Sequence, residues 1–408
     1  MKDQLQQIQH LQFRDRSGAE ALLLSFVRDV YSPDVATVEL RPLAISLNSF
    51  NGFLTMADGR RYFFKTHTES DSVIGEYYNA TLLAEAGYPV IQPIFSSTEA
   101  GRQFLVYEIV SAPSVFDTAW AIENNQTDRL PALTRAQQAA DNDLLRIYRA
   151  TLQPQTALEA AQSPIHQLFY HRLAGGRLSR FYADTATINL PGGETAVGDV
   201  FAVRWHINGQ IYTDDLRAII ERATRLLNPA QAGPSIIGHG DAHNGNIFIE
   251  QDRLVYFDPA FAGRHHPLLD IVKPLFHNVF AMWMYFPNEK RDQTPITLER
   301  SDDVWRVQYE YPLHLIREMF LHSKVERVLI PVLSELLRRS WLREDWREYL
   351  KAALFCCPFL TMNLADGEKF PPEISLLGLC MAVEMGAESQ SARSILDRTL
   401  DEVARAIR

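Results

Sequence analysis

The chain has 408 residues, of which 46% are hydrophobic, 22% charged and 11% aromatic. This is ordinary globular composition, which argues against a disordered or fibrous protein, and the length favours two or three structural units. Forty Lys and Arg against fifty Asp and Glu give a formal net charge of −10, so the overall charge disfavours binding to nucleic acid and leans weakly towards a cationic substrate.

Targeting signals and cysteine patterns point to a cytoplasmic protein. The first residues, Met1 to Gln7, are too polar for a signal peptide, and apolar runs such as 279–286 are too short to cross a membrane. The three cysteines form neither a disulfide framework nor a C-x-x-C metal motif. We therefore expect no membrane partner, and the sequence does not predict an oligomeric state.

The first region with a clear pattern runs from residue 38 to 110. Apolar and polar residues alternate as in β-strands on both sides of a turn at Ala57-Asp58-Gly59. A helical pattern follows at 72–86, and strand character returns at 103–110. This order predicts a small sheet with one helix.

The middle of the chain, residues 113–234, has mostly helical periodicity. Its strongest predicted helices lie at 136–151 and 214–227. It is interrupted by Leu190 to Gly193 and by a hairpin turn predicted at Asn208-Gly209. No motif in this region points to a particular chemistry.

A strand, a loop and a hairpin are predicted over residues 236–257. Helices are predicted from there to the end of the chain, including 328–337 and 374–385. The sequence therefore predicts an α+β fold with two lobes. Residues 1–110 would form a small N-lobe around an antiparallel sheet, and residues 111–408 a larger, mainly helical C-lobe.

The strongest chemical signal lies at residues 237–246, Ile-Gly-His-Gly-Asp-Ala-His-Asn-Gly-Asn. A glycine-containing loop after a strand places Asp241 and Asn246 on a tight connection, and the following hairpin returns Asp258 to their side. Two carboxylates and an amide are hard oxygen ligands, which suit Mg²⁺ completed by water and phosphate oxygens. The pattern predicts phosphoryl transfer, with Asp241 acting on the acceptor proton and with Asn246 and Asp258 as metal ligands.

The spacing of five residues between Asp241 and Asn246 matches the catalytic loop of protein kinases. The run His239-Gly240-Asp241-Ala242-His243-Asn244-Gly245-Asn246, followed by Phe257-Asp258, resembles the aminoglycoside phosphotransferase and choline kinase-like family. That family's loop commonly reads His-Gly-Asp-x-His-x-x-Asn. The resemblance implies a protein-kinase-like fold, ATP and Mg²⁺ as cofactors, and transfer of the γ-phosphate to a hydroxyl of a small metabolite or antibiotic. It also implies structural roles for His239 and for Asp270.

The N-terminal region contains nucleotide-binding candidates in the order that such an enzyme needs. Lys65 ends a predicted strand and would reach the phosphates, and Glu76 in the following helix would orient it. Ser49 and Asn51 lie where the resemblance places the nucleotide-covering loop. The backbone from Glu108 to Val110 would contact adenine between the lobes.

Simpler interpretations compete with these assignments. Asp241 could be a turn residue that caps backbone amides, and Lys65 a solvated strand residue. Two other classes of protein also stay open. One is a nucleotide-binding kinase-like module without catalysis, and the other is a metal-dependent hydrolase that uses His239 and His243 and needs a third zinc ligand. The agreement of the predicted positions in order and spacing favours the kinase interpretation.

Overall fold

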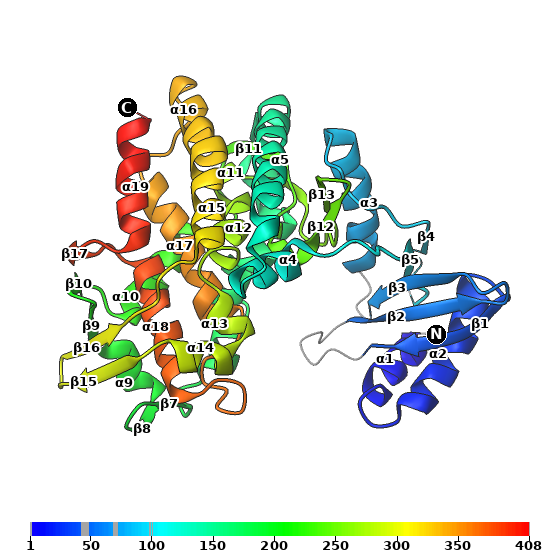
Figure 1. Cartoon of the computed structure of the whole chain (residues 1–408), viewed down its shortest axis with the longest axis horizontal. Helices are drawn as coiled ribbons and strands as arrows, with labels where there is room; N and C mark the ends of the chain where they lie inside the picture. Colours follow the sequence, from blue (N-terminus) through cyan, green and yellow to red (C-terminus); the bar gives the residue numbers. More distant parts are fainter. Residues whose placement is uncertain (1, 42–48, 68–71, 98, 100, 408) are drawn as a thin grey trace.

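The computed structural model describes residues 2–41, 49–67, 72–97, 99 and 101–407, and of residues 2, 3, 49, 67 and 72–78 it describes the backbone alone. Figure 1 shows a sheet near the N-terminus beside a larger, mainly helical part. The predicted α+β class, with a small antiparallel sheet followed by a mainly helical region, is confirmed.

The N-terminal sheet has five strands in the order β1-β2-β3-β5-β4, and every neighbouring pair is antiparallel. Its elements are α1 (Lys2–Leu11), α2 (Arg16–Val30), β1 (Val35–Leu40), β2 (Ser49–Met56), β3 (Arg61–His67), α3 (Ser72–Ala86), β4 (Phe95–Ser97) and β5 (Phe104–Glu108). The helix predicted at 72–86 is confirmed as α3. The helices α1 and α2 have no counterpart in the prediction.

The two faces of this sheet have different neighbours. Alternation along β3 sends Phe64 to one face, where it packs in an apolar core with Phe26 of α2. It sends Phe63 and Lys65 to the other face, where the rings of Phe63 and Phe257 meet edge to face with centroids 6.1 Å apart. The face that carries Lys65 is therefore the one that contacts Phe257 and Asp258, whereas α1 and α2 pack on the first face.

The larger part is built mainly of helices. They are α4 (Val115–Glu123), η1 (Thr127–Arg129), α5 (Leu130–Thr151), α6 (Ala157–Ala161), η2 (Pro164–Leu168), α7 (Tyr170–Ala174), α8 (Arg177–Phe181), α9 (Val197–Ala202), α10 (Leu216–Leu226), η3 (Asn244–Asn246), α11 (Pro267–Asp270), α12 (Val272–His277), α13 (Met282–Tyr285), α14 (Pro287–Gln293), α15 (Leu315–Lys324), η4 (Val325–Leu329), α16 (Ile330–Arg338), α17 (Trp346–Leu360), α18 (Pro372–Gly386) and α19 (Ile395–Ala406). The helices predicted at 136–151, 214–227 and 374–385 fall on α5, α10 and α18, and the one at 328–337 spans the junction of η4 and α16. None of the described helices combines the length and apolar composition needed to cross a membrane.

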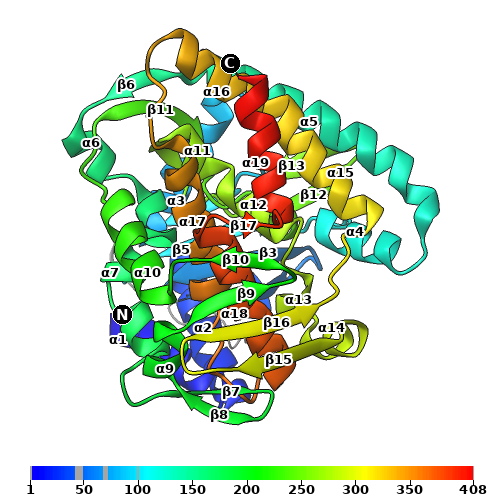
Figure 2. The ribbon, with the colours of Figure 1, turned by 90° about the vertical axis from the view of Figure 1, so that its left-hand side faces the viewer.

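Strands in the larger part form several small sheets. They are β6 (Gln153–Gln155), β7 (Thr187–Leu190), β8 (Gly193–Ala196), β9 (Arg204–Ile207), β10 (Gln210–Tyr212), β11 (Gly233–Gly238), β12 (Ile247–Glu250), β13 (Arg253–Tyr256), β14 (Gly263–His265), β15 (Ile296–Arg300), β16 (Val304–Tyr309) and β17 (Gln390–Ser391). The hairpin turn predicted at Asn208-Gly209 is confirmed, with φ angles of 52° and 79°. The prediction of helices alone after residue 257 was wrong, because β15 and β16 form a hairpin that extends the sheet of β9, β10 and β17 (Figure 2).

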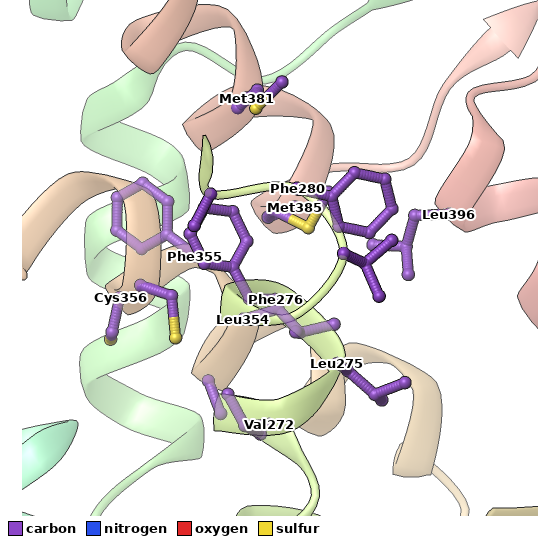
Figure 3. Close-up of a cluster of buried hydrophobic side chains, with 14 of the residues drawn as sticks. Val272, Leu275, Phe276, Phe280, Leu354, Phe355, Cys356, Met381, Met385 and Leu396 are labelled. Carbon is purple, nitrogen blue, oxygen red and sulfur yellow. The ribbon is translucent and has the colours of Figure 1, made fainter. Parts of the chain in front are cut away.

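A buried apolar cluster holds α12, α17 and α18 together. Figure 3 shows Val272 and Phe276 of α12 near Leu354 and Phe355 of α17, with Met385 of α18 close by. All five side chains are buried. Close packing of this kind leaves little freedom for a helix to shift, so α12 gives the polar residues on its other face a fixed position.

The division of the chain after residue 110 stays a prediction. The strand β5 ends at Glu108 and the next helix begins at Val115, which is consistent with a connection there. However, Leu83 in α3 and Tyr88 just after it belong to the larger apolar core, and the Tyr88 hydroxyl donates a hydrogen bond to the carbonyl of Ile237 at 3.1 Å. The helix α3 therefore packs against both parts of the molecule.

Candidate active site

Residues 233–258 form the strand, loop and hairpin that the sequence predicted. The strand β11 leads into the loop, η3 follows, and β12 and β13 pair as a hairpin. Two glycines make the loop possible. A Cβ atom at Gly238 would lie 2.5 Å from the carboxylate of Asp270, and Gly240 has a φ of +80° with a Cβ position 2.5 Å from the carbonyl oxygen of Phe261. Any larger residue would force the loop to move.

This loop brings Asp241, Asn246 and Asp258 together. The side-chain amide of Asn246 donates a hydrogen bond to the carbonyl oxygen of Asp241 at 3.0 Å. The backbone N–H of Phe257 donates to the carbonyl oxygen of Asn246 at 2.9 Å, which fixes the position of the following Asp258. Asp258 has a φ of +57°, a left-handed conformation that Asp and Asn tolerate better than most residues.

Lys65 reaches the same loop from the N-terminal sheet. Its ammonium nitrogen lies 2.6 Å from Oδ1 of Asp258, and the two side chains are 11% and 34% exposed. Asn51 is the cross-strand partner of Lys65 on β2. The structure thus joins predicted residues that are 193 positions apart in the chain.

Of the other predicted nucleotide-binding residues, the structure describes the side chains of two and only the backbone of two more. Glu108 is exposed at the end of β5, and Val110 is half-buried just beyond it. The backbones of Ser49 and Glu76 lie in β2 and α3, but their side chains lie outside the described residues. The pairing of Lys65 with Glu76 therefore stays a prediction.

Asp241 has an oxygen that is ready for a ligand. Its Oδ1 atom is buried and has no hydrogen-bond partner among the described residues. The nearest cation is the ammonium of Lys273, 3.6 Å from this oxygen and only 3% exposed. Burial alone would raise the pKa of Asp241, but the positive charge of Lys273, together with that of Arg172, outweighs burial and holds the pKa below its ordinary value. Asp241 is therefore a carboxylate at neutral pH.

His239 acts as a structural link within the loop. Its Nε2 lies 3.0 Å from the carbonyl oxygen of Phe257, and its Nδ1 accepts a hydrogen bond from the backbone N–H of Asp241 at 3.4 Å. A neutral imidazole protonated on Nε2 satisfies both contacts, and burial lowers the pKa of His239. With both nitrogens engaged, His239 has no lone pair left for zinc.

His243 lies on the other side of the loop, beside residues that the sequence analysis missed. Its Nδ1 accepts a hydrogen bond from the backbone N–H of Gly245 at 3.1 Å, and its ring centroid is 5.7 Å from that of His277. The ring of His277 lies 3.3 Å from the ammonium of Lys273 through Nε2 and 2.8 Å from the hydroxyl of Tyr285 through Nδ1. Burial is the main cause that lowers the pKa of both histidines, so they are neutral at pH 7.

The segment 265–278 holds the loop that carries Asp241 in place through hydrogen bonds. The Asp270 carboxylate accepts hydrogen bonds from the backbone N–H of Gly240 at 2.6 Å and from the hydroxyl of Tyr148, and it pairs with His265 at 2.9 Å. Further along, Oδ1 of Asn278 accepts from the backbone N–H of Asn244 at 2.8 Å. These contacts agree with the structural role expected for Asp270.

Lys273 and Asn278 were not among the predicted site residues, although the sequence contained a signal for the lysine. Lys273 is the one lysine in the run 268–280, which is mainly apolar and reads Leu-Leu-Asp-Ile-Val-Lys-Pro-Leu-Phe-His-Asn-Val-Phe. A buried cation needs a partner of opposite charge. In a chain with a predicted catalytic Asp at position 241, that requirement points to Asp241 as the partner of Lys273.

Replacing Asp270 with alanine should destabilise the protein strongly. The change leaves Tyr148 and His265 buried without their acceptor, and removal of one member of a buried polar pair typically costs about 3–5 kcal/mol. Urea denaturation of Asp270→Ala against Asp143→Ala, an exposed helical control that pairs only with Arg146, measures the difference. If the free energy of unfolding of Asp270→Ala falls by less than about 1 kcal/mol, the contacts of Asp270 with Tyr148, His265 and Gly240 do not support the loop.

The donor atoms near Asp241 fit a hard divalent cation better than zinc. The amide nitrogen of Asn246 is committed to a hydrogen bond, which leaves its oxygen for a ligand, and the Lys65 ion pair engages Oδ1 of Asp258, which leaves Oδ2. Among the described residues no group of three or more His, Cys, Asp or Glu could hold a metal ion. One amide and one carboxylate oxygen are the partial set that Mg²⁺ uses when phosphate and water complete its shell.

Comparisons with known proteins agree with this geometry. The model of the phosphotransferase enzyme family matches residues 39–302, which is more than half of the chain. No curated protein sequence matches the chain.

Several solved structures are similar to the chain at low identity. Amicoumacin kinase hAmiN, solved with AMP-PNP, Ca²⁺ and Ami, has 14% identity and a TM-score of 0.45 over 95% of this chain and 92% of that one. Aminoglycoside phosphotransferase APH(4)-Ia, solved with ADP and hygromycin B, has 10% identity and a TM-score of 0.47 over 91% and 99%. Choline kinase from Cryptosporidium parvum Iowa II has 10% identity and a TM-score of 0.41 over 90% and 94%. The α+β class that the sequence predicted, with a small antiparallel sheet followed by a mainly helical part, is the one that the structure has.

Proposed function

Because the chain belongs to the phosphotransferase enzyme family, we propose that it is an ATP-dependent small-molecule kinase that transfers the γ-phosphate to a hydroxyl group. The observation that carries this proposal is the buried Oδ1 of Asp241, which has no hydrogen-bond partner among the described residues, beside Asn246 and the Lys65–Asp258 ion pair. Phosphoryl transfer needs a base near the acceptor, oxygen ligands for a metal and a cation for the phosphates. All three kinds of group meet at this loop.

Each residue has a defined task in this proposal. Asp241, an ionised carboxylate at neutral pH, orients the acceptor hydroxyl and accepts its proton. Lys65 contacts the phosphates of ATP, and its position opposite Asn51 puts it on the face of the sheet that is free of α1 and α2. Asn246 and Asp258 would hold Mg²⁺, which when bound neutralises charge on the β- and γ-phosphates.

The adenine side of the proposed site is apolar and aromatic. Tyr107 of β5 packs against Phe257 with ring centroids 5.2 Å apart, and Phe63 packs against both. The backbone from Glu108 to Val110 follows directly after Tyr107, where it would supply hydrogen bonds to the base. Aromatic and apolar surface of this kind suits a planar purine.

The two other classes of protein have less support. An inactive nucleotide-binding module would lack at least one of the catalytic groups, whereas Lys65, Asp241, Asn246 and Asp258 are all present and close to one another. A zinc hydrolase would need His239, whose ring nitrogens are both engaged with the backbone. No observation favours either over the kinase.

A thermal-shift titration with ATP and Mg²⁺, added separately and together, tests the proposal. Mass action predicts a stabilisation of about 2.7 kcal/mol when the ligand is at a hundred times its Kd, and we expect this shift to require both ATP and Mg²⁺. In Asp258→Asn the part that depends on the metal should disappear, because the substitution removes the charge of a metal ligand. The same samples then serve to screen hydroxyl acceptors by ADP release.

Asp252→Asn is a matched control for this experiment. Asp252 lies at the tip of the same hairpin and, like Asp258, has a left-handed backbone, with φ of 65° against 57°. Asparagine tolerates that conformation, so both substitutions change charge without adding strain. If neither ATP nor Mg²⁺ shifts the melting temperature of the wild type, the kinase proposal fails.

A further inference from the structure

Positive charge gathers near Asp241. Lys273 of α12 lies 3.6 Å from Asp241 and is almost completely buried. Arg172 of α7 and Arg177 of α8 reach the end of α17, where Nη1 of Arg172 lies 3.4 Å from Oγ1 of Thr361 and Nη1 of Arg177 lies 3.2 Å from the carbonyl oxygen of Leu360. Because α12 packs on α17 (Figure 3), the three cations belong to one region of the fold.

The carboxylates nearby do not balance this charge. Asp258 is paired with Lys65, and Asp270 is surrounded by His265, Tyr148 and the N–H of Gly240. The neighbouring histidines His243 and His277 are neutral and add no charge. Among the described residues, Asp241 is thus the one carboxylate whose negative charge favours the charged forms of both Lys273 and Arg172.

Arg172 also has unused hydrogen-bonding capacity. Its Nε atom is buried and has no hydrogen-bond partner among the described residues, and its one described side-chain contact, to Thr361, is long at 3.4 Å. A buried donor without a partner destabilises the folded protein, and more so when it is charged. A bound anion would give Nε of Arg172 an acceptor. The contact with Thr361 at the end of α17 uses a different nitrogen and leaves Nε without one.

We propose that Arg172 and Lys273 bind an anionic group of the acceptor, a carboxylate or a phosphate, next to the hydroxyl that Asp241 activates. This inference rests on the proposed kinase function and names its substrate class. The planar guanidinium of arginine matches the two oxygens of a carboxylate or phosphate, and the ammonium of lysine adds a point charge. The local charge thus opposes the weak preference for a cationic substrate that the net charge of −10 suggested.

The test compares anionic alcohols with uncharged counterparts of the same shape. Wild-type protein with Mg²⁺ and ATP is assayed for ADP release with glycerate and 4-hydroxybutyrate against their primary amides, with glycerol 3-phosphate against glycerol, and with choline as a cationic alcohol. The hydroxy acids and the alcohol phosphate separate the two sources of negative charge. We expect kcat/KM for the better anionic class to exceed that of its uncharged counterpart by about 10- to 100-fold, the equivalent of one charge-assisted hydrogen-bond pair.

The variant Arg172→Gln should reduce that ratio to nearly 1 and should keep the thermal shift with Mg²⁺ and ATP. Arg180→Gln is the matched control, because Arg180 is an exposed residue of α8 that stacks on Phe181. If no alcohol in the panel is accepted, acetate and inorganic phosphate serve as probes. Each should inhibit the slow hydrolysis of ATP in wild type and not in Arg172→Gln.

Several outcomes would overturn the inference. Uncharged or cationic alcohols could be phosphorylated at least as well as anionic ones, the ratio could be unchanged in Arg172→Gln, or no anion could have any effect. A loss of the Mg²⁺–ATP shift in Arg172→Gln would instead assign the arginine to the nucleotide, which also contradicts an acceptor site. The kinase proposal itself fails only if wild type shows no such shift, so the two failures are distinguishable.

Discussion

Asp241→Asn is expected to lower turnover by about 10²- to 10⁴-fold, the range that a positioned general base contributes. Asparagine has the same shape as aspartate but cannot accept the proton of the acceptor hydroxyl. In the wild type the Oδ1 atom of Asp241 is buried and has no hydrogen-bond partner among the described residues, so we expect this atom to accept the proton. The measurement is ADP release at saturating ATP, with an alcohol that the acceptor screen identifies.

Binding and folding should change much less than turnover in Asp241→Asn. The thermal shift with Mg²⁺ and ATP should remain, because Asn246, Asp258 and Lys65 are unchanged. The free energy of unfolding should fall, because the buried ammonium of Lys273 loses the negative charge that lies 3.6 Å away in the wild type. Asp252→Asn, on the same hairpin, should keep full turnover. An Asp241→Asn variant with turnover within a few-fold of wild type would show that Asp241 is only a turn residue.

The loop that carries Asp241 and Asn246 was predictable because its residue pattern is local in sequence. Asp241 and Asn246 are five residues apart, and a hairpin with a short turn must bring Asp258 back to their side. The same holds for the helix at 72–86 and for the hairpin at Asn208-Gly209, where local periodicity or turn chemistry decides the structure. In these cases little long-range information was needed.

Other features depend on contacts between distant segments, which one sequence does not reveal. The strand β16 has the alternating pattern Val-Trp-Arg-Val-Gln-Tyr, with Trp305 and Val307 buried, yet its pairing with β9 depends on residues about 100 positions away. Lys273 was overlooked for a related reason. Its apolar neighbours indicate a buried helix, but only the packing of α12 against the loop reveals that its ammonium faces Asp241. Helices α1 and α2 cover a face of the sheet that the sequence analysis did not consider.

Lys65→Ala is the second variant for which we expect a large effect, a loss of about 10²- to 10³-fold in turnover. This is the range seen when one preorganised electrostatic contact to the transition state is removed. Lys65 is the cation that the N-terminal sheet contributes to Asp258, with a distance of 2.6 Å between the charged atoms. Its loss leaves the phosphates without that charge, and it leaves Asp258 without the partner that holds its carboxylate.

Lys65→Ala also separates the kinase from the alternatives more sharply than any other substitution. A hydrolase that uses His239 and His243 does not need a cation on β3, so Lys65→Ala should leave its activity unchanged. A nucleotide-binding module without catalysis should show no turnover in either form. Arg61→Ala is the matched control, because Arg61 lies on the same strand but pairs with Glu39 at the surface of the sheet. We expect full turnover in Arg61→Ala and a large loss in Lys65→Ala, measured as ADP release under the same conditions. Equal activity of the two variants would remove Lys65 from the mechanism, and the phosphates would then need a different cation, for which Lys273 is the nearest candidate to Asp241.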